Sequence, residues 1–207
     1  MIPVVADDIG EVVAAMRPIG IKYGKPMVEY MARINNPSTT FDETFDYTYQ
    51  NANMLMMPFY MYGHRAEIAK RLLDKEKDKV YKFQKYPLIA LRMDIQELVS
   101  KGIWSYTLNI AILNFTDKKW NAEERMVNIF KPVLYPIYER FMEELRNSNK
   151  FFWPGNQDYP EHTVILRPFW GTENQEGNVK NIFNDPIDAI EITGLRLNQR
   201  VKNNLNC

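Results

Sequence analysis

The chain has 207 residues and a mass of 24.5 kDa, with 45% hydrophobic and 25% charged residues, which is the composition of a globular protein and not of a disordered one. Its 26 basic and 26 acidic residues cancel, and this balance argues against nucleic-acid binding driven by bulk charge, because affinity for phosphate needs a cationic surplus. One cysteine and two histidines are too few for a disulfide framework or a zinc site within one chain. Near-zero net charge also favours self-association.

The length predicts a single domain over residues 1–207. No window approaches 18 uncharged apolar residues, so we expect no membrane span. Asp7, Asp8 and Glu11 stand where a signal peptide would be apolar. We therefore expect a reducing cytosol, or an assembly built there, as the setting of the chain.

Apolar residues recur at helical spacing over residues 7–16, and Asp8 and Glu11 have the spacing of a capping box. The segment that follows has a different composition. Its runs 27–31 and 44–49 are rich in aromatic residues and β-prone, and turn residues separate them. This pattern predicts a β-hairpin insertion over residues 18–59. Its apolar side chains either meet a partner surface or fold back on their own domain.

The remainder of the chain predicts helices and strands in turn. Period-2 alternation over residues 104–112 marks the clearest strand, and Asn121 with Glu124 opens the main helix as a capping box. Pro132 and Pro136 lie inside that helix and predict a bend or break, and Gly194 shifts the phase of the last strand, which predicts a bulge. The other expected elements are a helix over 64–79, strands over 86–93, 163–170 and 187–201, a short connection over 94–102, an aromatic loop over 150–161 and a polar loop over 171–185.

This order predicts an α+β fold, with a mostly antiparallel four-stranded sheet, helices packed on one face and the inserted β-hairpin. Sequence motifs for catalysis are absent: there is no G-x-S-x-G elbow, no phosphate-binding P-loop and no dinucleotide fingerprint. We therefore expect no enzyme activity, no catalytic residue, no metal and no cofactor.

Carboxylates at strand ends leave one enzymatic alternative open, a magnesium-dependent nuclease or hydrolase. Asp188 and Glu191 frame the last strand, but Thr193 stands where such a nuclease would have a lysine. Asp188 could instead cap a turn, and Glu191 could be an exposed residue between buried isoleucines. The further carboxylates of this alternative are Asp94, Glu97 and Asp185.

Aromatic residues make up 13% of the chain and gather in the hairpin and at the ends of elements, where a subunit or partner interface would use them. The candidate interface residues are Tyr30, Phe45, Tyr47, Tyr49, Phe151, Phe152, Trp153 and Trp170. A monomeric adaptor that binds one protein partner would use the same side chains.

The order of motifs resembles a family of viral structural proteins. The segment 85–91 (KYPLIAL) resembles the first sheet strand of small proteins from the head-to-tail junction of tailed bacteriophages. The segments 108–113 (LNIAIL), 122–125 (AEER) and 130–138 (FKPVLYPIY) resemble their second strand and main helix, 188–192 (DAIEI) their closing strand, and 61–68 (MYGHRAEI) the helix start before the sheet. The family is the tail-terminator and head–tail connector group, in particular the forms found in phages of gut Bacteroidetes, the crAss-like phages included.

This resemblance covers residues 1–17 and 60–201, with the hairpin as an insertion. It implies a structural virion protein, assembled in the host cytoplasm into a hexameric or dodecameric ring at the portal, neck or tail. DNA would pass through the channel without sequence-specific binding, and the ring would dock on the portal and on adjacent neck or tail proteins. It implies no enzyme activity and no cofactor. The size of the insertion also fits a neck or tail ring of a short-tailed phage.

Overall fold

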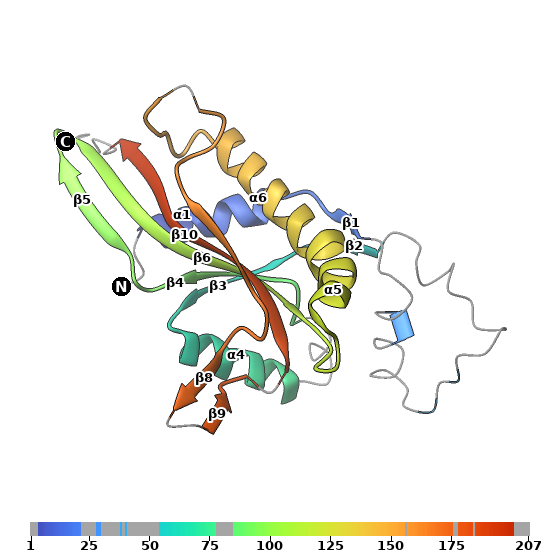
Figure 1. Ribbon diagram of the computed structural model, residues 1–207. Coiled ribbons are helices and arrows are strands. Elements are labelled where there is room, and N and C mark those ends of the chain that lie inside the picture. Colours follow the sequence, from blue (N-terminus) through green and yellow to red (C-terminus); the bar gives the residue numbers. More distant parts are fainter. Residues whose placement is uncertain are drawn as a thin grey trace.

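The computed structural model describes residues 4–21, 28–29, 38, 40, 54–77, 85–155, 157–175, 178–183 and 185–200. Its centre is a six-stranded sheet of order β3-β4-β6-β10-β7, in which β5 pairs with the part of β6 that β4 leaves free (Figure 1). All neighbours are antiparallel except β3 and β4. The strands are β3 (Phe59–Gly63), β4 (Leu88–Arg92), β5 (Gln96–Ser100), β6 (Ile103–Phe115), β7 (Thr163–Arg167) and β10 (Ile187–Arg200). The predicted α+β class with a mostly antiparallel sheet is confirmed, with six strands instead of four.

The long antiparallel pair of β6 and β10 forms the spine of the sheet, with 13 and 14 residues. β6 alternates as its sequence predicts, since Tyr106 and Leu108 are buried between half-buried neighbours. The register shifts between Ile192 and Leu195, and Gly194 has a φ of +66° there, a conformation that glycine adopts without strain. The predicted bulge at Gly194 is confirmed.

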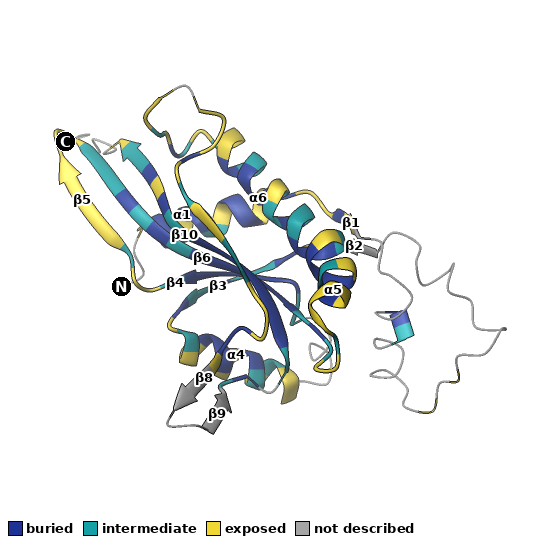
Figure 2. Ribbon diagram, in the orientation of Figure 1, coloured by how far each residue is buried: buried dark blue, intermediate teal, exposed yellow. Residues whose placement is uncertain are grey.

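Helices cover both faces of the sheet (Figures 1 and 2). Alternate residues of β4 divide between two hydrophobic cores: Ile89 and Leu91 pack with α1 (Val4–Ala15) and the main helix, whereas Leu88 and Ala90 pack with α4 (Arg65–Lys77). The prediction that the helices pack on one face is therefore wrong for α4. Because α4 joins the parallel neighbours β3 and β4, this connection has to cross a face of the sheet.

The main helix has three parts, α5 (Ala122–Arg125), the π-helical stretch η1 (Met126–Leu134) and α6 (Tyr135–Asn147). The predicted capping box is confirmed, with Glu124 N–H donating to Asn121 Oδ1 at 3.0 Å and Asn121 N–H donating to Glu124 Oε2 at 2.8 Å. At Pro132 the helix does not break but changes from α-helical to π-helical hydrogen bonding. Pro132 lies inside η1, and Tyr135 N–H donates to the carbonyl of Phe130, five residues back.

Two predicted connections contain strands. Residues 94–102 hold β5, and residues 171–185 hold the hairpin of β8 (Thr172–Gln175) and β9 (Asn178–Asn181). The predicted cap at Asp8 is also wrong, because α1 begins at Val4. Asp8 is buried inside the helix and accepts hydrogen bonds from Lys150 Nζ at 2.8 Å and from Gln199 Nε2 at 2.7 Å.

The predicted insertion 18–59 is joined at its ends, since β1 (Ile19–Ile21) pairs antiparallel with β2 (Met54–Met56). Within the predicted strand 27–31, Val28 and Glu29 are described and both are helical, not extended. Val28 is buried in the larger core, so at this residue the segment packs on its own domain. The predicted strand 44–49 lies outside the described residues.

Candidate functional site

Asp188, at the start of β10, is fully buried in an ion pair with Arg125. Arg125 Nη1 lies 2.6 Å from Asp188 Oδ1 and 2.9 Å from Oδ2, and Phe169 N–H donates to the same Oδ1 at 3.0 Å. The guanidinium carbon of Arg125 is 3.9 Å from the centre of the Phe169 ring. The carboxylate is thus saturated by structural partners, which a buried charge requires.

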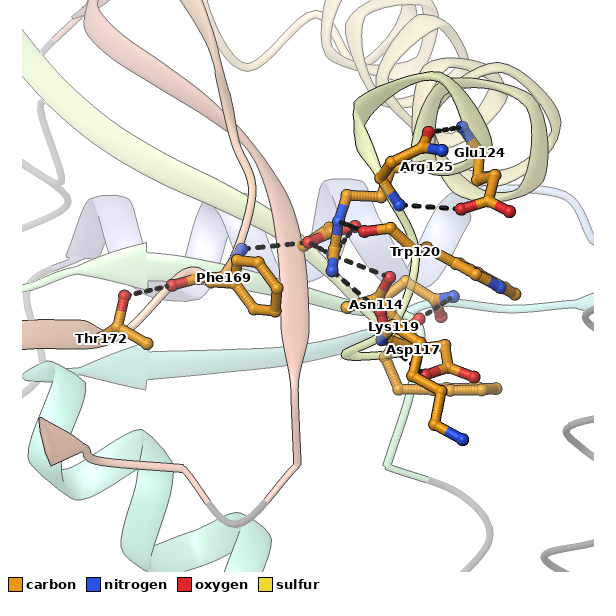
Figure 3. Close-up of polar contacts among 12 residues, drawn as sticks. Asn114, Asp117, Lys119, Trp120, Glu124, Arg125, Phe169 and Thr172 are labelled. Carbon is orange, nitrogen blue, oxygen red and sulfur yellow. Dashed lines mark hydrogen bonds and ion pairs between the residues drawn. The ribbon is translucent and has the colours of Figure 1, made fainter. Parts of the chain in front are cut away.

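The rest of the Arg125 guanidinium holds the loop between β6 and α5. Its Nε donates to the carbonyl of Trp120 at 2.9 Å, its Nη2 to the carbonyl of Asp117 at 2.8 Å, and its Nη1 to Thr116 Oγ1 at 3.1 Å. One side chain therefore joins the end of β6, the start of the main helix and the start of β10 (Figure 3). Planar, permanently charged arginine suits this role because its donors lie in a fixed fork.

Glu191 is buried three residues further along β10 and is the centre of a second cluster of polar contacts. It accepts hydrogen bonds from Trp170 Nε1 at 2.7 Å, Arg167 Nε at 2.9 Å and Arg65 Nη2 at 3.1 Å. The Arg65 guanidinium also lies over the Trp170 ring, 5.1 Å from its centre. Burial raises the pKa of Glu191, but the hydrogen bonds from Trp170 and Arg167 and the charges of both arginines outweigh it and hold the pKa below its usual 4.5.

The lowered pKa of Glu191 predicts a pH dependence of stability. Ionised Glu191 stabilises the folded chain at pH values above its pKa in the unfolded chain, and this contribution is lost as the pH falls through the lower folded pKa. We expect Glu191→Gln to lower the urea midpoint clearly at pH 7 and much less at pH 3. Glu161→Gln is the matched control, since the Glu161–Arg196 pair is exposed on both sides; an equal loss at both pH values for Glu191→Gln would contradict the assignment.

The structure does not bring the carboxylates of the nuclease alternative together. Asp188 and Glu191 are three residues apart on one strand, so they point to opposite faces of the sheet. Asp94 binds Arg92 and Asn109, and Asp185 binds Lys85. Within the described part of the chain, no group of three or more histidine, cysteine, aspartate and glutamate residues is arranged to hold a metal ion.

The predicted interface aromatics divide into three groups. Phe151 and Trp170 are buried in the chain itself, which corrects their prediction as surface residues; the indole N–H of Trp170 is satisfied by Glu191. Phe152 is 37% exposed and Trp153 is half-buried, so these two remain accessible. Tyr30, Phe45, Tyr47 and Tyr49 lie outside the described residues.

An exposed strand with apolar side chains, β5, lies in the predicted connection 94–102. Every residue of β5 is exposed, including Leu98 at 66% and Val99 at 55% (Figure 2). β5 and β6 are joined by the two-residue turn of Lys101 and Gly102, whose φ values of +50° and +76° are those of a hairpin turn that matches the strand twist. This Lys-Gly pair is the sequence signal that could have revealed the strand.

β7 forms the opposite edge of the sheet and is also accessible. It pairs with β10, and no further strand of the described residues pairs with it. Val164 is 37% exposed, and Ile165 and Leu166 are half-buried. The chain therefore carries two different apolar strand edges on opposite sides of one sheet, which we call the β5 edge and the β7 edge.

Comparison with family models, with curated proteins and with solved structures finds no match for this chain. Among the helices in the described ranges, none has both the length and the apolar composition that crossing a membrane requires.

Proposed function

We propose that the chain is a structural subunit of an oligomeric ring at the head-to-tail junction of a tailed bacteriophage. The ring, of six or twelve subunits, seals or extends the DNA channel and docks on the portal and on adjacent neck or tail proteins. The observation that carries the proposal is the pair of accessible apolar strand edges, β5 and β7. A ring built from one kind of subunit needs two different, complementary patches on each copy.

The charge of the chain also supports this role. Its basic and acidic residues balance, whereas a protein that grips DNA releases counterions through a surplus of lysine and arginine. A ring of subunits without a cationic surplus suits a channel through which DNA slides. The virion is the site of action under this proposal, with assembly in the host cytoplasm.

The buried carboxylates weaken the nuclease alternative. A catalytic metal needs carboxylate oxygens that converge and remain open to a cation and water. Asp188 instead accepts hydrogen bonds from Arg125. Glu191 accepts them from Arg65, Arg167 and Trp170. A monomeric protein-binding adaptor is the remaining candidate, because an exposed apolar edge serves it equally.

Two assays separate these functions. Negative-stain images of the purified protein are expected to show rings with six-fold or twelve-fold symmetry around a central opening. DNA incubated with the protein and magnesium is expected to stay intact. Magnesium-dependent cleavage that Glu191→Ala abolishes would overturn the proposal in favour of a nuclease, and isolated monomers in the images would favour an adaptor.

A further inference from the structure

We infer that the β5 edge of one subunit pairs antiparallel with the β7 edge of a second copy, so that the sheets of neighbouring subunits become continuous. The inference rests on the proposed ring and names its subunit contact. Both strands are five residues long. Neither β5 nor β7 contains lysine or proline, which natural proteins place on edge strands to prevent pairing, and each strand has a single charged residue, Glu97 in β5 and Arg167 at the end of β7.

The hydrogen-bonding pattern between β5 and β6 determines which backbone groups of β5 point away from β6. The two-residue turn makes Ser100 and Ile103 a hydrogen-bonded pair, so Leu98 also directs its N–H and C=O toward β6. Backbone bonding alternates along a strand. Glu97 and Val99 therefore direct their N–H and C=O outward, where a further strand can pair.

The same reasoning applies to β7. Thr116 N–H donates to the carbonyl of Pro186 and Trp170 N–H to the carbonyl of Ile187, so odd-numbered residues at the start of β10 bond toward the β7 side. Ile165 is paired with the odd-numbered Glu191 and bonds inward. Val164 and Leu166 then direct their backbone groups outward.

Aligning the ends of the two strands gives side-chain pairs of matching character. In this register Leu98 lies opposite the neighbour's Ile165 and Val99 opposite its Val164, so apolar side chains that are accessible in one copy cover each other. Polar residues meet at the strand ends, Gln96 with Arg167 and Ser100 with Thr163. The one mixed pair is Glu97 with Leu166.

The strand directions, and the offset between β5 and β7 along the sheet, also allow the same contact to repeat from one subunit to the next. β5 and β10 each run antiparallel to β6, and β7 runs antiparallel to β10, so β5 and a β7 from a copy in the same orientation meet antiparallel. Ile165 pairs with Glu191, and Glu191 pairs with Ala111 of β6, so Ile165 and Ala111 lie at the same height along the sheet. Leu98 pairs with Ser105 of β6, six residues from Ala111. The neighbour is therefore displaced by six residues, about 20 Å, along the strands and by four strand spacings, about 19 Å, across them.

Because the displacements along and across the strands are nearly equal, the line from one subunit to the next makes an angle of about 45° with the strands. This is close to the strand tilt of about 35–45° in closed barrels. It also leaves room for β3. β3 lies beyond β4 at the level of β6 residues 110–113, whereas the neighbour's β7 would lie beyond β5 at the level of residues 103–107. A heterologous contact of this kind closes into a ring when its rotation divides a full turn.

Disulfide cross-linking tests the register. In a Cys207→Ser background, Leu98→Cys and Ile165→Cys together place two thiols at a non-hydrogen-bonded pair, whose Cα separation of about 4.5 Å lies within the range of disulfides. Oxidation is expected to give a ladder of covalent multimers on non-reducing gels. The matched control is Leu98→Cys with Val164→Cys, on the same two strands but opposite sheet faces, which is expected to stay unlinked.

The outcomes distinguish the contact from the ring. A ring-sized assembly by light scattering with no ladder would overturn the β5–β7 contact and leave the proposed ring intact. A dimer from Leu98→Cys alone would overturn it in favour of two β5 edges pairing about a two-fold axis. A ladder from open chains that exceed twelve subunits would support the contact and overturn the ring. A monomer without any ladder would overturn both.

Discussion

Replacing Arg125 with alanine is expected to lower the free energy of unfolding by about 3–5 kcal/mol, because it leaves the buried carboxylate of Asp188 without its cation. The exposed fractions of the two side chains are 3% and 0%. The same substitution releases the Trp120 and Asp117 carbonyls that hold the loop before the main helix. Urea unfolding at pH 7, followed by tryptophan fluorescence, measures the change at one protein concentration, since assembly would couple to stability.

The matched control is Arg196→Ala. Arg196 pairs with Glu161, and both side chains are more than half exposed, so its loss is expected to cost less than about 1 kcal/mol. Equal effects of the two substitutions would contradict the account of Arg125 as the tie between β6, the main helix and β10.

Placing lysine at both Leu98 and Val99 is expected to convert the proposed ring to monomers without unfolding the chain. Both side chains are exposed in the single subunit, so the fold loses little packing. Two charges on an open strand edge oppose its pairing with another strand. Size-exclusion chromatography with light scattering measures the mass, and circular dichroism confirms that the fold is kept.

Val127→Lys is the control for a general effect of removing an exposed apolar side chain. Val127 lies on η1 and is exposed to a similar degree as Val99. It is expected to leave the assembly unchanged. An oligomer that withstands the double lysine variant, or that Val127→Lys disrupts equally, would contradict the role of the β5 edge.

The sequence predicts those elements whose pattern is local and strong. Period-2 alternation identifies β6, the Asn121–Glu124 spacing identifies the start of the main helix, and Gly194 identifies the bulge. β5 has no such pattern, because all five of its residues are exposed and neither face therefore requires alternating apolar residues. β3 (Phe59–Gly63) overlaps the end of the predicted insertion and the segment 61–68 that the resemblance assigns to a helix start, so the sequence does not predict it as a strand.

The polar contacts around Glu191 join residues that are far apart in the sequence, so the sequence alone does not reveal them. Glu191 meets Arg65 across 126 residues of sequence, and only the β3–α4–β4 crossover brings Arg65 to that face of the sheet. In the sequence Glu191 had two interpretations, a metal-binding carboxylate or an exposed residue between buried isoleucines. It is buried, and three donors satisfy it. The interface prediction for Trp170 rests on its place at the end of an element, whereas its burial depends on Glu191, which is distant in sequence and accepts its indole N–H.

The most direct test of the proposed function is the mass of the folded 207-residue chain, measured by light scattering over a range of concentrations. The account predicts a single species of six or twelve times the 24.5 kDa of one chain, stable on dilution. A mass equal to one chain at every concentration would contradict it.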